Sequence, residues 1–248
     1  MKIGVYGLGR FGFFWSELLA QRFDVSGYNR SLLTEKPGNV DLVSEDTILQ
    51  SDVLFLCVSI SSLESVLKNI AGRIKPGCLV FDTCSVKVHP VNIMKLLLPD
   101  NIQIIGLHPM FGPDSGKDGV KDLPIVFIPV RDRPGIAEEW KKIFHDFGMK
   151  VIEITAELHD RDAAYTQGVT HFIGRVLNEL QLKDNEISTM GYKSLLTIVE
   201  QTCNDPFQLF MDLQHYNPYT HGMRQKLNDS LKKTMRMLTE ADPIRDSD

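Results

Sequence analysis

Short apolar runs alternate with helix-like segments along the first 154 residues, and this alternation constrains the fold more than any other feature of the chain. Most of the runs are apolar throughout, which is typical of strands that are covered on both faces. The expected strands are Ile3–Tyr6, Val25–Tyr28, Val53–Val58, Leu79–Phe81, Ile102–Leu107, Ile125–Pro129 and Val151–Ile154. The helical patterns between them include Phe11–Arg22, Leu63–Ile74, Val91–Leu98 and Ala137–Phe147. This order predicts a Rossmann-type α/β domain over residues 1–154, with a doubly wound and mostly parallel sheet.

The pattern changes at Thr155, and from there on the sequence predicts helices and no strand. Apolar or small residues recur every four positions and give one helical stripe, made of Ala164, Gly168, Phe172, Val176 and Leu180. Further helices are expected over Ser194–Thr202, Pro206–Gln214 and His221–Leu238, followed by a polar, frayed tail over Ala241–Asp248. Residues 155–248 are therefore predicted to form an all-helical domain. We expect this domain to make a homodimer, because a small apolar helical unit often packs against a second chain.

The composition excludes several partners and locations. A net charge of −5 without basic clusters argues against nucleic acid or an anionic membrane surface. No apolar run approaches the roughly 20 residues that a membrane helix needs. The chain starts at once with the strand-like Lys2–Tyr6, so we expect no signal peptide and a cytoplasmic location. The four cysteines include no CxxC pair, and we expect reduced thiols and no metal site.

A glycine-rich loop, Gly7 to Gly12 (GLGRFG), follows the first expected strand and opens the first expected helix. Gly7 permits a tight turn, Gly9 lets the backbone approach a pyrophosphate, and Gly12 lets helix and strand pack closely. The phosphates would lie on the free N–H groups of the helix N-terminus. With Arg10 and Phe11 this loop predicts a dinucleotide site; the alternative is a tight strand–helix turn that binds nothing.

The end of the second expected strand indicates which dinucleotide is bound. An NAD site usually places Asp or Glu there for the ribose hydroxyls, whereas this strand continues into Asn29, Arg30 and Ser31. Arg30 can pair with a 2′-phosphate, to which Asn29 and Ser31 can donate hydrogen bonds, so we predict NADP over NAD. The alternative is that Arg30 is a solvated loop charge. After the next expected strand, Ser59 and Ile60 are further candidate cofactor contacts, although Ser61 and Ser62 can equally cap a helix.

Two loops at strand ends carry candidate catalytic groups. Ser85 lies in DTCSVK (82–87), and His108 opens the turn HPMFGP (108–113). A neutral His108 can take a hydroxyl proton as a hydride departs, and Ser85 can donate or accept a hydrogen bond. The alternatives are a structural turn histidine for His108 and a helix cap for Ser85. Lys87 is expected behind these groups or at the surface.

Residues 1 to about 225 resemble the prephenate/arogenate dehydrogenase family, the oxidoreductases that form tyrosine. The resemblance rests on five motifs in order: GLGRFG (7–12), DTCSVK (82–87), HPMFGP (108–113), THFIGR (170–175) and GYKSLL (191–196). The HPMFGP wording and the segment Asn204–Phe207 are most similar to the arogenate-using, plant-like branch. The resemblance implies an oxidative decarboxylation, with hydride transfer to a nicotinamide and loss of CO2. It also implies that His108 and Ser85 hold the 4-hydroxyl of the substrate ring.

The family has a helical histidine near the substrate, and its counterpart here is His171. Gln167, His171 and Arg175 are spaced at i, i+4 and i+8, so they share one helix face and are candidate substrate-binding residues. Some prephenate-specific members carry a second histidine where this chain has Gly174, and an arginine that the stretch Leu195–Glu200 lacks. Asp205 is the candidate partner for the ammonium of arogenate, with a helix cap as the alternative. We therefore expect arogenate rather than prephenate.

Two other functions are compatible with a Rossmann domain followed by helices. A dehydrogenase of the β-hydroxyacid type would use a catalytic lysine, for which Lys193 is the candidate, although it lacks the usual glycine and asparagine neighbours. A non-catalytic NADP-binding regulator would need neither Ser85 nor His108. Formation of the reduced cofactor with arogenate or prephenate distinguishes the first function from these two.

Overall fold

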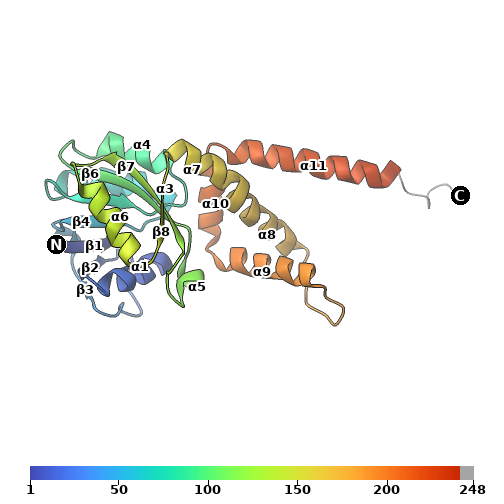
Figure 1. The fold of residues 1–248 in the computed structure, drawn as a ribbon, viewed down its shortest axis with the longest axis horizontal. Coiled ribbons are helices and arrows are strands. Elements are labelled where there is room, and N and C mark those ends of the chain that lie inside the picture. Colours follow the sequence, from blue (N-terminus) through green and yellow to red (C-terminus); the bar gives the residue numbers. More distant parts are fainter. Residues whose placement is uncertain (241–248) are drawn as a thin grey trace, which may run out of the picture. The chain divides into compact units, whose positions relative to one another are not determined.

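The computed structural model describes residues 1–240; the tail expected over Ala241–Asp248 lies outside the described residues. The chain divides into two compact units, Met1–Asp160 and Arg161–Asp248. The first unit is built on a β-sheet and the second is helical, which confirms the predicted fold class (Figure 1). The first unit runs on beyond residue 154 because Ala156 still packs against Val91, Val126 and Ile128 of the sheet unit.

One eight-stranded sheet forms the centre of the first unit, in the order β3-β2-β1-β4-β5-β6-β7-β8. Its strands are β1 (Lys2–Tyr6), β2 (Asp24–Tyr28), β3 (Val40–Leu42), β4 (Val53–Leu56), β5 (Leu79–Asp82), β6 (Gln103–Pro109), β7 (Pro124–Arg131) and β8 (Lys150–Glu153). All neighbours are parallel except β6 and β7. The edge strand β3 was not predicted, because it is three residues long and exposes two of them.

The pairing of the last three strands shows where β8 ends relative to His108. His108 of β6 pairs with Val126 of β7, and Val126 pairs with Ile152 of β8. β8 therefore stops at Glu153, one residue past the level of His108, although β7 continues to Arg131.

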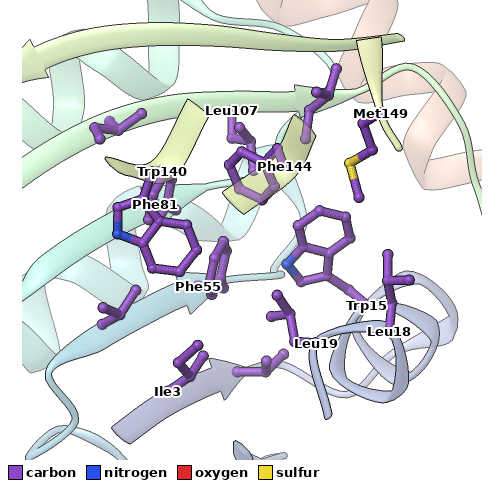
Figure 2. Close-up of a cluster of buried hydrophobic side chains, with 14 of the residues drawn as sticks. Ile3, Trp15, Leu18, Leu19, Phe55, Phe81, Leu107, Trp140, Phe144 and Met149 are labelled. Carbon is purple, nitrogen blue, oxygen red and sulfur yellow. The ribbon is translucent and has the colours of Figure 1, made fainter. Parts of the chain in front are cut away.

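Helices cover both faces of this sheet. They are α1 (Arg10–Ala20), α2 (Glu45–Ile48), α3 (Ile60–Ile70), the 3-10 turn η1 (Ala71–Arg73), α4 (Val88–Leu97), α5 (Pro113–Gly116) and α6 (Ile136–Asp146). On one face, Trp15 of α1 and Trp140 and Phe144 of α6 pack on strand residues Phe55 and Phe81 (Figure 2). The Phe55 and Phe81 rings stack at 4.6 Å, and Trp140 meets Phe81 edge-on at 4.9 Å. This aromatic core holds β4 and β5, whose ends carry candidate site residues, in a fixed position.

The second unit contains the end of α7 (Ala156–Ala163), the π-helical segment η2 (Ala164–Gly168), α8 (Val169–Glu179), α9 (Met190–Asn204), α10 (Phe207–Tyr216) and α11 (Thr220–Glu240). The predicted apolar stripe is only partly buried: Ala164 and Gly168 are buried, but Val176 and Leu180 are exposed. A π turn adds a residue to the helical repeat, so a spacing of four does not stay on one side. Over residues 1–240, no helix is both long enough and apolar enough to cross a bilayer.

Candidate active site

The glycine loop has the geometry that a dinucleotide site needs. Gly7 has φ +99° and donates its N–H to Tyr28 O at 2.8 Å. A Cβ on Gly12 would lie 1.9 Å from Gly7 O, so α1 can approach β1 only without a side chain there. A Cβ on Gly9 would meet no atom of the described residues within 4 Å. Packing therefore explains Gly7 and Gly12, whereas Gly9 fits a position kept bare for a bound group.

The other predicted residues of this loop make contacts within the protein. Arg10 forms an ion pair with Asp114, and Phe11 stacks on Trp15 with ring centroids 5.7 Å apart. The Asn29 side chain accepts a hydrogen bond from Leu8 N at 3.0 Å and donates one to Ser31 O at 2.9 Å. Asn29 thus ties the end of β2 to the glycine loop, which leaves Arg30 as the main candidate for a phosphate.

Arg30 and Ser31 are both exposed, and Arg30 makes no ion pair within the described residues. Ser59 is the N-cap residue of α3, and its hydroxyl lies 2.6 Å from the Ser62 hydroxyl. The Ile60 side chain is buried, so that only its backbone can face a ligand.

A groove of about 710 Å³ borders the glycine loop, between α1, Leu33–Glu35 and Pro113–Val120. Neither His108 nor Ser85 lines it, and we assign it no part in the chemistry.

Four neighbouring parallel strands bring the candidate groups of the first unit to one edge of the sheet. In the order β1-β4-β5-β6, the chain continues from these strands into Gly7, Ser59 and Ser85, and His108 is the penultimate residue of β6. Ligands of doubly wound sheets bind at this carboxyl edge. His108 belongs to the strand itself, paired with Val126, and not to the turn in which it was predicted. The strand position holds its backbone more rigidly than a turn would.

His108 begins a buried chain of hydrogen bonds. Its Nδ1 lies 2.8 Å from Nε2 of His159, whose Nδ1 lies 2.8 Å from Oδ1 of Asp160. All three side chains are buried. Burial lowers the pKa of His108 well below its ordinary value, and the positive charge of the neighbouring Lys87 lowers it further. His108 is therefore neutral at pH 7, which is the state that its predicted role as proton acceptor requires.

Asp160 also fixes the backbone beside Ser85. Its two carboxylate oxygens accept the N–H groups of Lys87 at 2.7 Å and Val88 at 2.9 Å. These N–H groups start α4, so a carboxylate from α7 caps this helix, and Ser85 does not. The Ser85 hydroxyl is buried and has no hydrogen-bond partner among residues 1–240. An unpaired buried hydroxyl is costly, which favours a role toward a ligand.

A buried ion pair lies behind these groups. Lys87 contacts Asp82 and donates a hydrogen bond to Leu107 O at 2.6 Å, and neither charged side chain is exposed. The expectation for Lys87 is thus settled: it is an internal residue that joins the ends of β5 and β6. Burial raises the pKa of Asp82 despite the adjacent ammonium.

The candidate residues of the second unit share one feature. Three buried atoms have no hydrogen-bond partner in the part of the chain that the structure describes: Gln167 Oε1, His171 Nδ1 and Arg175 Nε. Arg175 Nη2 donates to Asp205 O at 2.8 Å, and the guanidinium lies 5.5 Å from the ring centre of Phe207. Asp205 follows α9, and α10 begins with Pro206 as its N-cap, so Asp205 does not cap α10. Three orphaned polar atoms along one helix are compatible with a polar ligand.

Sequence reasoning missed His159 and Asp160. They are 51 residues or more from His108, so no local spacing relates them to it. The adjacent His–Asp pair shortly before the predicted helical stripe was the available signal. Within residues 1–240, no group of three or more His, Cys, Asp or Glu side chains could hold a metal ion.

Together the fold and the glycine loop are those of a nucleotide-binding α/β protein, with a buried histidine pair at the carboxyl edge of its sheet. Residues 22–152 match the family model for the prephenate dehydrogenase nucleotide-binding domain, and residues 176–246 match the TYRAAT1-like C-terminal domain. The chain is 36% identical to arogenate dehydrogenase 2 (chloroplastic) of Arabidopsis thaliana, over 95% of this chain and 70% of the relative. It is 37% identical to arogenate dehydrogenase 1 of the same plant, over 88% of this chain and only 36% of that relative. The chain belongs to the prephenate dehydrogenase family, as the sequence motifs indicated.

Solved structures share the fold. Synechocystis arogenate dehydrogenase matches with a TM-score of 0.71 and 20% identity, over 97% of this chain and 92% of that one. Prephenate dehydrogenase from A. aeolicus, in complex with hydroxyphenyl propionate and NAD+, matches with a TM-score of 0.72 and 16% identity, over 98% and 93%.

Proposed function

We propose that this chain catalyses the oxidative decarboxylation of arogenate to tyrosine and CO2, with prephenate as the alternative substrate. The observation that carries the proposal is the buried, neutral His108 on the same sheet edge as the glycine loop and the unpaired Ser85 hydroxyl. Relatives named as arogenate dehydrogenases support it.

The proposed chemistry assigns separate tasks to the two residues. A bound nicotinamide ring supplies the hydride acceptor for the ring carbon that bears the 4-hydroxyl. His108 takes the hydroxyl proton as the C–H bond breaks and a C=O bond forms, while Ser85 orients the same oxygen. The C–C bond to the ring carboxylate then breaks, its electron pair makes the ring aromatic, and His108 returns the proton to the oxygen. The balance is substrate anion and oxidised cofactor to tyrosine, CO2 and reduced cofactor, with no net proton released.

NADP is the proposed cofactor, with NAD less favoured. No carboxylate follows β2, and the exposed Arg30 makes no ion pair in the described part of the chain. A Schizosaccharomyces pombe relative, 27% identical, is named as a probable NADP(+) prephenate dehydrogenase, whereas the A. aeolicus structure contains NAD+. Arg30→Ala should raise the KM for NADP and leave that for NAD unchanged. Equal effects on both cofactors would contradict the assignment.

Arogenate is the proposed substrate because of what surrounds the α8 residues. A Cβ at Gly174 would lie 2.1 Å from the Thr202 hydroxyl of α9. This contact leaves no room for the second histidine that some prephenate-specific members carry at this position. Gln167, His171 and Arg175 keep polar atoms that can meet the substrate carboxylates. Asp205 remains the proposed partner of the ammonium group; the electrostatic influence of Asp205 on His171 is consistent with a shared location.

Steady-state kinetics with arogenate and prephenate, each against NADP and NAD, tests the proposal through the absorbance of the reduced nicotinamide. We expect the highest kcat/KM for arogenate with NADP. His108→Asn should lower kcat by about 10²–10⁴-fold while cofactor binding is retained. Absence of product from either substrate would refute the proposed reaction.

The β-hydroxyacid dehydrogenase reading requires a desolvated lysine. Lys193 is exposed and lies 3.9 Å from Asp184, so it has the surroundings of a surface charge. This contact favours the arogenate reaction over that alternative.

We further propose a homodimer and a cytoplasmic location. In the described part of the second unit, large apolar side chains such as Leu231, Met235 and Leu238 of α11 are exposed.

Burial raises the pKa of the Cys78 thiol to about 12 and holds that of Cys84 well above its ordinary value, which suits thiols that stay reduced. Both Arabidopsis relatives are named as chloroplastic, so imaging a fluorescent fusion of the full-length protein in its own cell tests the location.

A further inference from the structure

We propose that His159 and Asp160 are positioning residues that hold His108 in the one tautomer able to accept the substrate proton. This inference rests on the proposed function, because it assumes that His108 faces the reacting hydroxyl. It adds two residues that neither the motifs nor the resemblance assigned, and it predicts on which nitrogen each proton lies.

The direction of each hydrogen bond follows from Asp160. Its carboxylate accepts N–H groups from Lys87 and Val88, one on each oxygen, and Oδ1 also lies 2.8 Å from His159 Nδ1. A carboxylate used in this way is an acceptor, so His159 must carry its proton on Nδ1. In the neutral His159 ring, Nε2 then carries no proton, and its lone pair can accept a hydrogen bond.

The proton on His159 Nδ1 in turn determines which nitrogen of His108 is protonated. Because His159 Nε2 accepts, the 2.8 Å contact requires His108 to donate from Nδ1. A neutral His108 is then left with its lone pair on Nε2, the nitrogen that makes no bond to His159. The hydrogen-bonded chain His108–His159–Asp160 is called the relay below. If His159 were absent, the two tautomers of His108 would both be available, and one of them presents N–H where a base is needed.

The relay also keeps its geometry during the reaction. When His108 takes a proton, Nδ1 continues to donate to His159, so no hydrogen bond has to be exchanged. The negative charge of Asp160 lies two hydrogen bonds away and favours the imidazolium that forms. The charged and titratable groups near His108 are thus His159 and Lys87, and each has a carboxylate partner: Asp160 for His159 and Asp82 for Lys87.

Asp160 gives the relay a second connection. Its bonds to the N–H groups of Lys87 and Val88 hold the segment that follows Ser85. One carboxylate therefore fixes both the ring that takes the proton and the loop that carries the orienting hydroxyl. This double use makes Asp160 a poor first target for mutation, since its loss would also uncap α4.

His159 is the better residue to substitute, because its side chain does not cap α4. His159→Leu removes the acceptor, whereas His159→Gln keeps a side-chain oxygen that can accept from His108. Glu157→Gln, on the exposed side of the same helix, is the matched control. We expect His159→Leu to lower kcat by at least about tenfold, up to the full base contribution of about 10²–10⁴-fold. The His159→Gln variant should recover part of this loss, Glu157→Gln should retain wild-type kcat, and the Kd for NADP should not change in any of the three.

The tautomer itself can be measured without turnover. In protein labelled with ¹⁵N-histidine, long-range ¹H–¹⁵N correlation spectra should show His108 Nδ1 protonated and Nε2 as the lone pair in the wild type. His159→Leu should mix the two forms. A wild-type His108 protonated on Nε2 would overturn the proposal, as would a His159→Leu variant with unchanged kcat and an unchanged pH profile.

The two levels of inference fail separately. If the wild type forms no product from arogenate or prephenate, the proposed reaction is wrong, and the spectra alone decide whether the relay sets the tautomer. If the wild type is active and the spectra contradict the tautomer, only the relay is wrong.

Discussion

At the scale of single residues, the glycine loop separates packing from binding. Gly12→Ala would place a Cβ against the Gly7 carbonyl, whereas the Cβ of Gly9→Ala has no neighbour from residues 1–240 within 4 Å. We expect Gly12→Ala to lower the thermal midpoint and to weaken NADP binding. We expect Gly9→Ala to keep the wild-type midpoint of the unliganded protein and to weaken only NADP binding. Thermal unfolding and equilibrium titration with NADP measure both; a Gly9→Ala protein with normal affinity would show that the loop does not hold the pyrophosphate.

His108 also links stability to pH. Its pKa is lowered by burial in the folded chain, so the unfolded chain binds more protons as the pH falls below the ordinary histidine value of about 6.5. Its contribution to stability is therefore complete above that value and is lost as the pH falls toward the lowered pKa. His171, whose pKa burial also lowers, has the same sign.

Urea unfolding of the wild type and of His108→Asn at a series of pH values between about 5 and 8 tests this linkage. The difference in unfolding free energy between the two proteins should be constant near neutral pH and shrink on acidification. A difference that grows as the pH falls would mean that His108 is charged in the fold. Because both proteins contain the same carboxyl groups, the contribution of these groups cancels in the difference between the two unfolding free energies.

At the scale of elements, the Lys87–Asp82 pair joins the ends of β5 and β6. Lys87→Met would leave a buried carboxylate without its cation, which typically costs about 3–5 kcal/mol. The double variant Lys87→Met/Asp82→Asn removes both charges and should recover much of this loss. Chemical denaturation gives the three free energies. If the single and double variants are equally unstable, the charge pair is not what holds these strand ends.

The elements that could be predicted from the sequence are those whose structure follows from a local residue pattern. The buried strands are continuous apolar runs, so β1, β4, β5 and β6 were predicted close to their observed bounds. β3 was missed because three residues at a sheet edge leave no periodicity. Ser85 and His108 were identifiable because they follow or end such runs. His159 and Asp160 were not, because their role depends on tertiary contacts between β6 and α7, and the π-helical turn at Ala164–Gly168 follows from packing that no spacing encodes.

At the scale of the whole molecule, the proposed dimer makes a further prediction. Leu231, Met235 and Leu238 lie at i, i+4 and i+7 on α11 and are all more than half exposed. Leu231→Glu/Leu238→Glu should convert the dimer to a monomer in light scattering coupled to size-exclusion chromatography. Lys232→Glu, an exposed position on the same helix, is the charge-matched control. A wild type that elutes as a monomer at micromolar concentration would contradict the dimer.

The early end of β8 has a consequence for how this site can change. β8 stops one residue past the level of His108, and α7 starts soon afterwards, which is how His159 comes within reach of that ring. The contact between the two histidines therefore depends on chain length as much as on residue identity. Inserting two residues after Glu153 would keep every catalytic side chain and the alternation of the strand, yet it would advance α7 past its partner. In this fold, a deletion or insertion far from any motif can separate His108 from His159 as completely as a point mutation.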